Sequence, residues 1–427
     1  MNKIVNPEKK DWPEILKRPT QTVADIEQTV NQIFDEIRVK GNAAVAKYTE
    51  LFDGIKLEDL QVSETEVQNA AKKISEELKA AITLAKSNIE KFHAAQKTEK
   101  VSVETTNGVK CWQEKKAIQK VGLYIPGGTA PLFSSILMLA IPARLAGCKE
   151  IILCTPPDKQ GNVNSAILYA AELCGVTQIF KIGGIQAIGA MTFGTENVPQ
   201  VYKIFGPGNQ FVTVAKQLAT KYQVAIDMPA GPSELLVFAD DTANAAFVAS
   251  DLLSQAEHGT DSQVIMVSTS EKLINLVSDE IEAQLNKLPR KAIADKAIEN
   301  SRLILVNSKE EALELINEYG PEHFIICSEN EDYFVQGVIN AGSVFIGNYT
   351  PESAGDYASG TNHTLPTNGY AKQYSGVNLD SFMKTITFQK ISEQGIKEIG
   401  PSIELLAEAE GLRAHKNAVS LRLKDLN

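Results

Sequence analysis

The sequence predicts an α/β fold with two parallel β-sheets covered by helices, for three reasons. Short apolar segments alternate with helical periodicity over residues 121–222, and a second alternation of similar design runs over residues 234–346. Strands joined through helices form parallel sheets, because each helix must cross back over the face of the sheet. The chain has 427 residues, 43% hydrophobic and 22% charged, which suffices for two or three globular domains.

An amphipathic helical region precedes the first alternating set. Residues 24–48 and 64–96 carry apolar side chains at three- and four-residue intervals among many charges. This spacing is typical of helices with one buried face. Asp53 and Gly54 separate the two segments, since glycine favours the end of a helix. The sequence therefore predicts a helical N-terminal region.

Glycine-bearing turns follow three expected strands of the first set, at residues 126–128, 183–184 and 206–209. Glycines at the carboxyl ends of parallel strands let the backbone approach a ligand, although ordinary turns use the same residues. No Gly-x-Gly-x-x-Gly fingerprint follows an expected strand, so a nucleotide ligand is favoured only modestly. The expected strands are residues 121–128, 150–154, 178–182 and 201–205, and the expected helices are residues 134–146, 165–173, 186–192 and 211–222.

The second set leads into a long polar segment at residues 353–377, where we expect a loop. Loops of this length in compact proteins are usually functional or disordered, and the mixture of polar and aromatic residues favours function. Residues 402–423 return to helical spacing and predict a tail that docks on its own chain or on a partner. The expected strands are residues 234–238, 263–268, 303–306, 324–327 and 343–346, and the expected helices are residues 243–258, 271–286 and 309–319.

Composition limits the classes of function. The net charge of −11 argues against broad binding to nucleic acid or anionic membranes. The N-terminus lacks the apolar core of a signal peptide, and the longest apolar run, residues 136–143, is far too short to span a bilayer. The five cysteines include no Cys-x-x-Cys pair, so we expect buried free thiols rather than disulfides or a cysteine zinc site. A soluble, cytoplasmic protein is expected.

Three histidine neighbourhoods differ in what they indicate. His93 lies in a charged helix, where we expect a solvated or helix-capping residue. Gln255 and His258 are three residues apart at a helix end, so they share a face and suit either a metal or the helix dipole. Glu322 and His323 are an adjacent acid and imidazole at a strand edge. They suit proton transfer, although two surface residues in a turn would look the same.

Two further histidines lie in the long polar segment and in the tail. Asp356 and His363 fall within residues 353–377, and both residue types are ordinary ligands of divalent metals. The surrounding asparagine, glycine and threonine also suit tight turns, which leaves a purely structural role open. His415 lies near the end of the tail, five residues after Glu410, where a histidine is normally solvated.

Seven motifs in this order carry a family resemblance. Together they make the chain resemble histidinol dehydrogenase from about residue 20 to the C-terminus. The resemblance implies oxidation of L-histidinol to L-histidine, the last step of histidine biosynthesis, with two NAD⁺ reduced per turnover. The motifs are residues 124–128, 205–209, 227–233, 254–258, 320–323, 353–367 and 410–415.

The resemblance also implies roles for individual residues. One Zn²⁺ per subunit is held by residues matching Gln255, His258, Asp356 and His415, the last of them from the other subunit of a homodimer. Residues matching Glu322 and His323 handle protons, and those matching Tyr124, Gln186 and Asn209 contact NAD. Substrate is contacted by residues matching Ser233, Gln255, His258, His323, Asp356, His363, Glu410 and His415.

A domain division accompanies this resemblance. We expect two Rossmann-like parallel-sheet domains, a helical N-terminal region and a C-terminal helical tail exchanged in the dimer. The expected division is an N-terminal segment, 1–22; a discontinuous α/β domain with the metal and catalytic residues, 23–120 with 237–375; an α/β domain on the NAD side, 121–236; and a dimer-contact tail, 376–427.

The implied chemistry is physically consistent, with one tension. Zinc has no redox chemistry, so electrons must pass to NAD⁺, and four protein ligands usually mark a closed structural zinc. The metal must therefore expand its coordination to admit substrate. His323 is expected to remove the alcohol proton, and Glu322 to activate water at the aldehyde stage, with no cysteine nucleophile. Two alternatives are a zinc hydrolase on the same scaffold and a nucleotide-binding module without activity.

Overall fold

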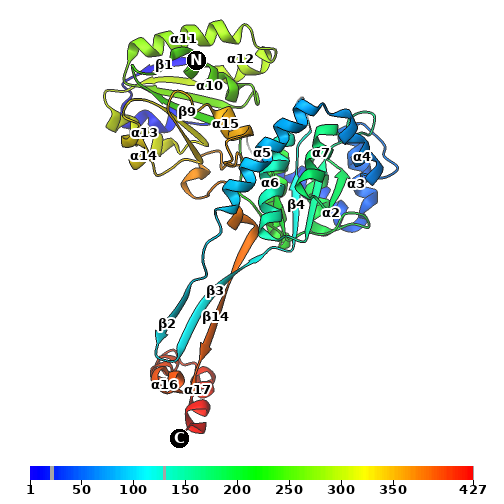
Figure 1. The fold of residues 1–427 in the computed structure, drawn as a ribbon, viewed down its shortest axis with the longest axis vertical. Helices are drawn as coiled ribbons and strands as arrows, with labels where there is room; N and C mark the ends of the chain where they lie inside the picture. Colours follow the sequence, from blue (N-terminus) through cyan, green and yellow to red (C-terminus); the bar gives the residue numbers. More distant parts are fainter. Residues whose placement is uncertain (20–23, 128–130, 427) are drawn as a thin grey trace.

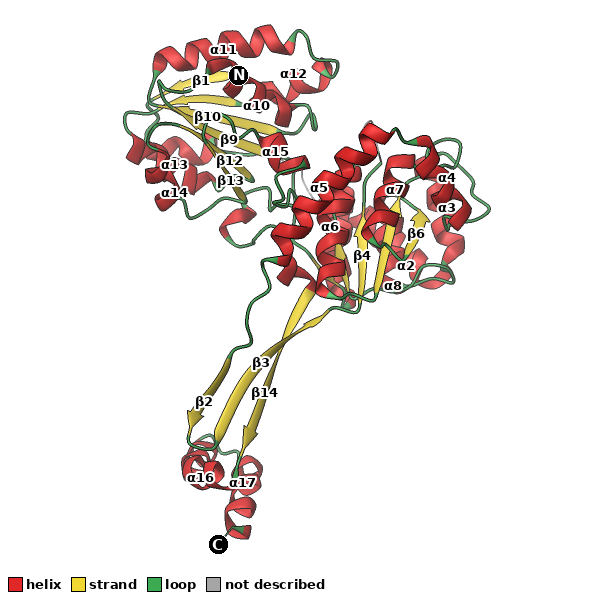
Figure 2. Ribbon diagram, viewed as in Figure 1, coloured by secondary structure: helices red, strands yellow, loops and turns green. Residues whose placement is uncertain are grey.

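The protein consists of two α/β bodies and one extended arm (Figure 1 and Figure 2). The computed structural model describes residues 1–19, 24–127 and 131–426. One body holds a five-stranded sheet, the other a six-stranded sheet, and the arm a three-stranded sheet. The chain ends at the tip of the arm, far from both bodies in the view of Figure 1. Across the described ranges, no helix combines the length and apolar character needed to cross a membrane.

The five-stranded sheet is parallel throughout, with the order β6-β5-β4-β7-β8. Leu123 of β4 lies beside Leu153 of β5 and Phe205 of β7, and all three side chains are buried. The expected alternation of strands and helices is confirmed here, while Gly128 of the expected turn lies outside the described residues. The elements are β4 Lys120–Tyr124, α6 Phe133–Ala146, β5 Glu150–Thr155, α7 Ser165–Cys174, β6 Gln178–Lys181, α8 Gly184–Phe193, β7 Lys203–Phe205, α9 Gln210–Ala219 and β8 Ala225–Ile226.

The N-terminal helices pack around this sheet, so the expected grouping of residues 23–120 with residues 237–375 is wrong. Helix α2 lies against α8 and α9, and α5 lies against α6. At the first contact, a Cβ added to Gly189 would lie 2.7 Å from Ile37. The apolar faces of α2, α3, α4 and α5 share their cores with the five-stranded sheet, and that burial decides which body they join.

Each of the two long N-terminal helices expected from the sequence is divided in two. Gly41, at φ +51°, ends the first helix of one pair, because this conformation is rarely open to other residues. Ser75 begins the second helix of the other pair by accepting a hydrogen bond from the Leu78 N–H at 3.2 Å. The four helices are α2 Ala24–Lys40, α3 Asn42–Asp53, α4 Glu64–Lys73 and α5 Glu76–Ala94.

The six-stranded sheet is also parallel, with the order β1-β11-β10-β9-β12-β13. Its edge strand β1 belongs to the stretch 1–22, which we expected to be a separate segment. Ile4 of β1 pairs with Ile304 of β11, so the described part of that stretch belongs to this body. The elements are β1 Asn2–Val5, α1 Trp12–Ile15, β9 Glu234–Ala239, α10 Ala245–Ala256, β10 Gln263–Ser268, α11 Glu271–Leu285, α12 Lys291–Glu299, β11 Arg302–Leu305, α13 Lys309–Tyr319, β12 His323–Cys327, α14 Glu331–Gly337, β13 Ser343–Ile346 and α15 Glu352–Tyr357.

The two parallel sheets share one topology. In each, the first five strands of the alternating set take the spatial order third, second, first, fourth, fifth, and the six-stranded sheet adds β1 at one edge. The strand order therefore reverses beside β4 and β7 in one body and beside β9 and β12 in the other. Such reversals are where open α/β sheets usually bind ligands. The similar design expected from the two alternations extends to strand order.

The arm was not expected from the sequence. Strand β3 is flanked by β14 and β2 in an antiparallel sheet, and two helices follow at its end (Figure 2). Strand β3 is rich in lysine and exposed or half-buried along most of its length, so it lacks the hydrophobic alternation of a half-buried strand. The arm elements are β2 Ser102–Thr106, β3 Val109–Ala117, β14 Met383–Ile391, α16 Glu393–Ala409 and α17 Arg413–Asp425.

Three cysteines, Cys154, Cys174 and Cys327, are buried as expected, and burial raises their thiol pKa values. Cys111 and Cys148 are only partly buried, contrary to the expectation for all five. Cys111 lies on β3 of the arm, where little core surrounds it.

Candidate active site

A pocket of about 300 Å³ is lined by residues of both α/β bodies. Pro207 and Asn209, which follow β7, contribute from the five-stranded body. The other side comes mainly from residues near the amino ends of β9 and β12 and the carboxyl end of α10. Seven of the nine residues expected to bind metal or substrate or to transfer protons line it: Ser233, Gln255, His258, Glu322, His323, Asp356 and His363.

Glu322 and His323 are held at the start of β12 by the neighbouring strand β9. The backbone N–H of Glu234 donates a hydrogen bond to Glu322 Oε2 at 2.8 Å. The carbonyl of the same residue accepts one from His323 Nδ1 at 3.3 Å. Both side chains are buried, with exposed fractions of 6% for Glu322 and 3% for His323. The adjacent acid and imidazole are therefore an ordered pair at the pocket wall, and the surface-turn alternative is excluded.

Carboxylates surround the His323 ring. His323 Nδ1 lies 3.6 Å from Glu322 Oε2 and 3.7 Å from Glu352 Oε1, while Nε2 lies 3.7 Å from Asp356 Oδ1. Burial opposes the charged form of the ring, but these acids outweigh it and raise the pKa of His323 well above its usual value. The buried Nε2 makes no hydrogen bond within the described part of the chain, so it is available to a ligand in the pocket.

The Glu234 side chain ties this strand to two other segments. Its carboxylate accepts hydrogen bonds from Arg18 Nε and Nη2, at 2.5 and 2.9 Å, and from the Asn368 N–H at 2.5 Å. Arg18 also stacks over the Tyr319 ring, 4.0 Å from its centroid. Because Glu234 holds Glu322 and His323 through its backbone, this network fixes the acid–imidazole pair in place.

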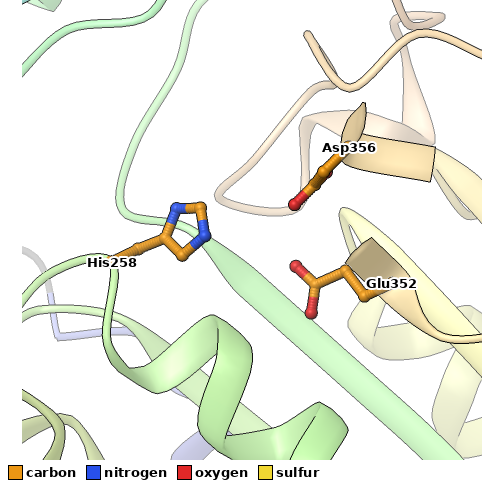
Figure 3. Close-up of side chains that lie close together, drawn as sticks. All are labelled: His258, Glu352 and Asp356. Atoms are coloured by element: carbon orange, nitrogen blue, oxygen red, sulfur yellow. The ribbon is translucent and has the colours of Figure 1, made fainter. Parts of the chain in front are cut away.

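His258, Glu352 and Asp356 form a group suited to a metal ion (Figure 3). One ligand atom from each residue lies within 4.8 Å of the others, and the two carboxylates face the imidazole in Figure 3. When the Gln255 amide is turned so that its nitrogen faces Glu352, it donates a hydrogen bond to the Glu352 carboxylate. In the same orientation its oxygen accepts a hydrogen bond from the Glu234 N–H at 3.1 Å. Among the expected ligands, Gln255, His258 and Asp356 are therefore brought together within one chain.

Glu352 was not singled out by the sequence. Its side chain is almost fully buried, and burial raises its pKa to about 8 despite the nearby His323. It stands one residue before the polar segment, and a single glutamate there gives no distinguishing pattern. The expectation of a loop over residues 353–377 is wrong in part, because α15 covers Asp356 and gives its carboxylate a fixed direction. A short 3₁₀ turn, Tyr370–Lys372, interrupts the rest.

His363 reaches the pocket from a segment held by the other body. Asn362 donates hydrogen bonds to His93 Nε2 at 3.3 Å and to the Met138 carbonyl at 2.7 Å, and accepts one from the Thr364 N–H at 3.0 Å. The expectation of a solvated or capping His93 is wrong. The ring is fully buried and donates from Nδ1 to the Ile89 carbonyl. Its charged helix has one buried face, which supplies this anchor.

Glu410 and His415 lie away from the pocket within this chain. Both are exposed at the tip of the arm, Glu410 at the end of α16 and His415 near the start of α17. The same tip exposes Leu405 and Leu406 of α16, with exposed fractions of 69% and 66%. Helix α17 contributes no buried side chain of its own.

The three expected NAD contacts line a second pocket, of about 700 Å³, at the carboxyl end of the five-stranded sheet. The Gly184 N–H donates to the Tyr124 hydroxyl at 3.0 Å. Buried Gln186 Oε1 lacks a hydrogen-bond partner in the described structure. Asn209 caps α9 and lines both pockets, so the two cavities are adjacent at this residue. A ligand extended through both would bring its two ends to different bodies.

Comparison with known proteins gives one consistent result. The family model for histidinol dehydrogenase matches residues 16–423. The chain is 61% identical to a histidinol dehydrogenase of Bacteroides thetaiotaomicron, covering 100% of both chains. It is 52% identical to one of Haemophilus influenzae, covering 97% of this chain and 96% of the relative. The crystal structure of histidinol dehydrogenase from Elizabethkingia anophelis superposes with a TM-score of 0.98 at 56% identity, covering 100% of this chain and 99% of the other.

Proposed function

The chain belongs to the histidinol dehydrogenase family, and from this premise we propose that it oxidises L-histidinol to L-histidine with two NAD⁺ and one Zn²⁺ per subunit. The observation that carries the proposal is the junction at Asn209. It joins a pocket lined by Tyr124 and Gln186 to a pocket lined by His323 and the candidate metal ligands. A nicotinamide entering from one side would meet a metal-held substrate on the other.

The donor set fits a zinc ion. Zinc bonds to nitrogen and oxygen at about 2.0–2.2 Å, so tetrahedral ligand atoms lie about 3.5 Å apart. The ligand atoms of His258 and Asp356 lie within 4.8 Å of each other, so small side-chain movements would close the site. Gln255 would add a bond through Oε1 when its amide turns so that the oxygen, rather than the nitrogen, faces the metal group beside Glu352. When bound, the metal would supply Lewis acidity and a template for the substrate imidazole and amine.

His323 and Glu322 would move the protons. A cation bound beside Asp356 would offset the negative charge that raises the His323 pKa, so the ring would be neutral when the site is loaded. Its Nε2, which has no hydrogen-bond partner among the described residues, would then accept the proton of the substrate hydroxyl while the carbon-bound hydrogen passes to NAD⁺ as hydride. The surrounding carboxylates stabilise the imidazolium that results. Glu322, next to it on the pocket wall, would then accept a proton from the water that adds to the bound aldehyde. A second hydride transfer yields the acid.

Ser233 and His363 would orient the substrate. Both line the pocket, and the buried Nε2 of His363 lacks a hydrogen-bond partner among the described residues. Burial lowers the pKa of His363, so the ring is held neutral and can accept or donate a hydrogen bond. Glu410 would contact the same substrate from a second copy of the chain.

A homodimer would complete the site. His415 is remote from His258 within one chain, and it sits beside exposed leucines at the tip of the arm. Exposed apolar clusters of this kind usually mark protein–protein contacts. We therefore assign the fourth zinc ligand to His415 of a second copy, with the arms of two chains reaching across to each other's pockets.

Mixing two inactive variants tests this shared site. After subunit exchange between His415→Ala and His258→Ala, half of the dimers would be mixed and each would regain one intact site, giving about a quarter of wild-type activity. A mixture of His258→Ala with Asp356→Ala is the control, because every site in a mixed dimer would carry a lesion. Recovery in neither mixture, with exchange verified by native mass spectrometry, would contradict the shared site.

The activity itself is tested by stoichiometry. Purified protein with L-histidinol and NAD⁺ is expected to form two NADH per histidine, to lose this activity on chelation, and to regain it when zinc is added. Metal-dependent turnover without NADH would indicate a zinc hydrolase instead. Nucleotide binding without metal-restored turnover would indicate a binding module.

A further inference from the structure

We propose that Asp53 selects the nucleotide: its carboxylate accepts hydrogen bonds from the ribose hydroxyls in the adenosine half of NAD and disfavours the 2′-phosphate of NADP. This assignment rests on the proposed use of NAD. Asp53 lines the 700 Å³ pocket together with Tyr124, Gln186 and Asn209. The sequence alone indicates only a helix end at this residue and Gly54.

The position of Asp53 is unfavourable for a carboxylate that serves folding alone. It is the last residue of α3, where the partial negative charge of the helix C-terminus repels an acid. The side chain is partly buried, and burial raises its pKa to about 6. A carboxylate offers about four acceptor positions. The hydrogen bond described for it comes from Gln186 Nε2 at 3.3 Å. Acceptor capacity therefore remains on an acid that faces a pocket.

The contact between the two pockets at Asn209 indicates which half of the nucleotide lies near His323. If the nicotinamide lies toward His323, the adenosine must lie toward the end of the pocket farther from that junction. Phe52, Pro156 and Pro157 line the same pocket as Asp53, and their apolar side chains offer surfaces on which a purine can pack. Asp53 lies beside Phe52 in sequence and lines the same pocket, so its carboxylate is placed for the adjoining ribose.

The glycine turn before α8 lies next to this carboxylate. A Cβ added to Gly183 would lie 3.2 Å from Asp53 Oδ1 and 2.7 Å from Pro156. The N-terminus of a helix attracts phosphate groups, and α8 begins here at Gly184. A pyrophosphate at this terminus would leave the neighbouring ribose within reach of Asp53. The buried Oε1 of Gln186, which has no hydrogen-bond partner among the residues that the structure describes, offers a further acceptor.

The same geometry opposes NADP. A 2′-phosphate is an anion on the ribose hydroxyl that would face Asp53, so it would lie against a carboxylate in a partly buried pocket. Lys159 also lines the pocket and could attract that phosphate. Selectivity for NAD would then require that the repulsion between the 2′-phosphate and Asp53 exceed the attraction between the 2′-phosphate and Lys159.

Binding of NAD⁺ and NADP⁺ to the zinc-loaded protein, measured by calorimetry, tests the assignment. Asp53→Ala is expected to weaken NAD⁺ binding about ten- to hundredfold, the usual loss for hydrogen bonds to a charged group. Asp53→Asn keeps the shape and removes the charge, so it is expected to reduce the preference for NAD⁺ over NADP⁺ at least about tenfold. Glu50→Gln, on the exposed side of the same helix, is the matched control and is expected to change neither.

Kinetics separate recognition from folding. With histidinol saturating, Asp53→Asn is expected to raise KM for NAD⁺ and leave kcat within about twofold, since the residue does not touch the reacting atoms. An unchanged ratio of NAD⁺ to NADP⁺ affinity in both variants would overturn the assignment, as would a wild-type protein that binds neither nucleotide. A selective shift in binding without any wild-type turnover would instead contradict the proposed function and leave the role of Asp53 standing.

Discussion

The five-stranded and six-stranded sheets have the same strand order, but they contribute to the pockets from opposite ends. The five-stranded body uses the carboxyl ends of β4 and β7, through Tyr124 and Asn209. The six-stranded body uses the amino ends of β9 and β12, through Ser233 and the pair Glu322 and His323. A shared topology therefore does not decide where a ligand binds.

The positions of the helix ends explain why the two sheets line the pockets with opposite edges. Helices between parallel strands run opposite to the strands, so their N-termini gather at the carboxyl edge and their C-termini at the amino edge. The positive ends favour phosphates, and the negative ends favour a metal cation or an imidazolium. Accordingly, Gly184 begins α8 in the pocket proposed for the nucleotide, while His258 follows the end of α10 in the pocket proposed for the metal. The two edges offer complementary charge to the two halves of one reaction.

The carboxyl edge of the six-stranded sheet differs from its counterpart. Asp240 and Asp241 follow β9 there, and they accept hydrogen bonds from Ser328 and Ser270. The chain has two acids after β9 where it has a glycine after β4, so a phosphate at this edge would be repelled by their negative charge. The hydrogen bonds of both acids are consistent with a structural role for this edge. Substitutions at each edge test the comparison.

The largest effect is expected at the amino edge of the six-stranded sheet. His323→Ala should lower kcat about 10²- to 10⁴-fold, the usual contribution of a general base. The affinity of the variant for NAD⁺, measured by calorimetry, should stay unchanged, because the pocket proposed for the nucleotide lies in the five-stranded body. A large loss of NAD⁺ affinity with kcat preserved would reverse the proposed division.

Next in size is the loss of a metal ligand. Asp356→Asn should release zinc on dialysis and raise KM for histidinol at least about tenfold, since even indirect partners of metal ligands contribute that much. Metal content by elemental analysis and steady-state kinetics check both parts. Full zinc retention with unaltered KM would remove Asp356 from the metal site.

A smaller effect is expected at the carboxyl edge of the five-stranded sheet. Tyr124→Phe removes the hydroxyl that accepts the Gly184 N–H, a hydrogen bond with a net contribution of about 1 kcal/mol. KM for NAD⁺ should rise about fivefold with KM for histidinol unaffected. The opposite pattern in the two KM values would argue that this pocket does not hold the nucleotide.

The smallest effect on activity is expected at the carboxyl edge of the six-stranded sheet. Asp240→Asn weakens the bonds to Ser328 and Thr242 and should lower the free energy of unfolding by about 1 kcal/mol. Both KM values and kcat should remain at the wild-type level. A selective rise in KM for NAD⁺, with the fold intact by denaturant titration, would mean that this edge also binds the nucleotide.

The sequence predicted most strands of both sheets because their strands and helices carry strong periodicity, but it did not predict the edge strands β1 and β8. The expected strand 263–268 and helix 309–319 match β10 Gln263–Ser268 and α13 Lys309–Tyr319. It assigned the N-terminal helices to the wrong body, because amphipathic spacing shows which face of a helix is buried but not which surface covers that face. The arm was missed because β3 buries little and lacks alternation.

The site was predicted in part for a similar reason. Residue type and spacing singled out Glu322, His323 and the metal candidates but left structural roles open. The family resemblance assigned their functions, and seven of the residues expected to bind metal or substrate or to transfer protons line one pocket. Glu352 was missed because its importance comes from burial beside His323, which no local pattern encodes. His93 was misjudged because its partner, Asn362, is distant in sequence.

A crystal structure with zinc, NAD⁺ and histidinol, with diffraction measured at the zinc absorption edge, tests the division between the two sheets most directly. The anomalous peak is predicted about 2.0–2.2 Å from His258 and Asp356, with nucleotide density at the carboxyl ends of β4 and β7. Nucleotide density beside Asp240, at the carboxyl ends of β9 and β12, would contradict it.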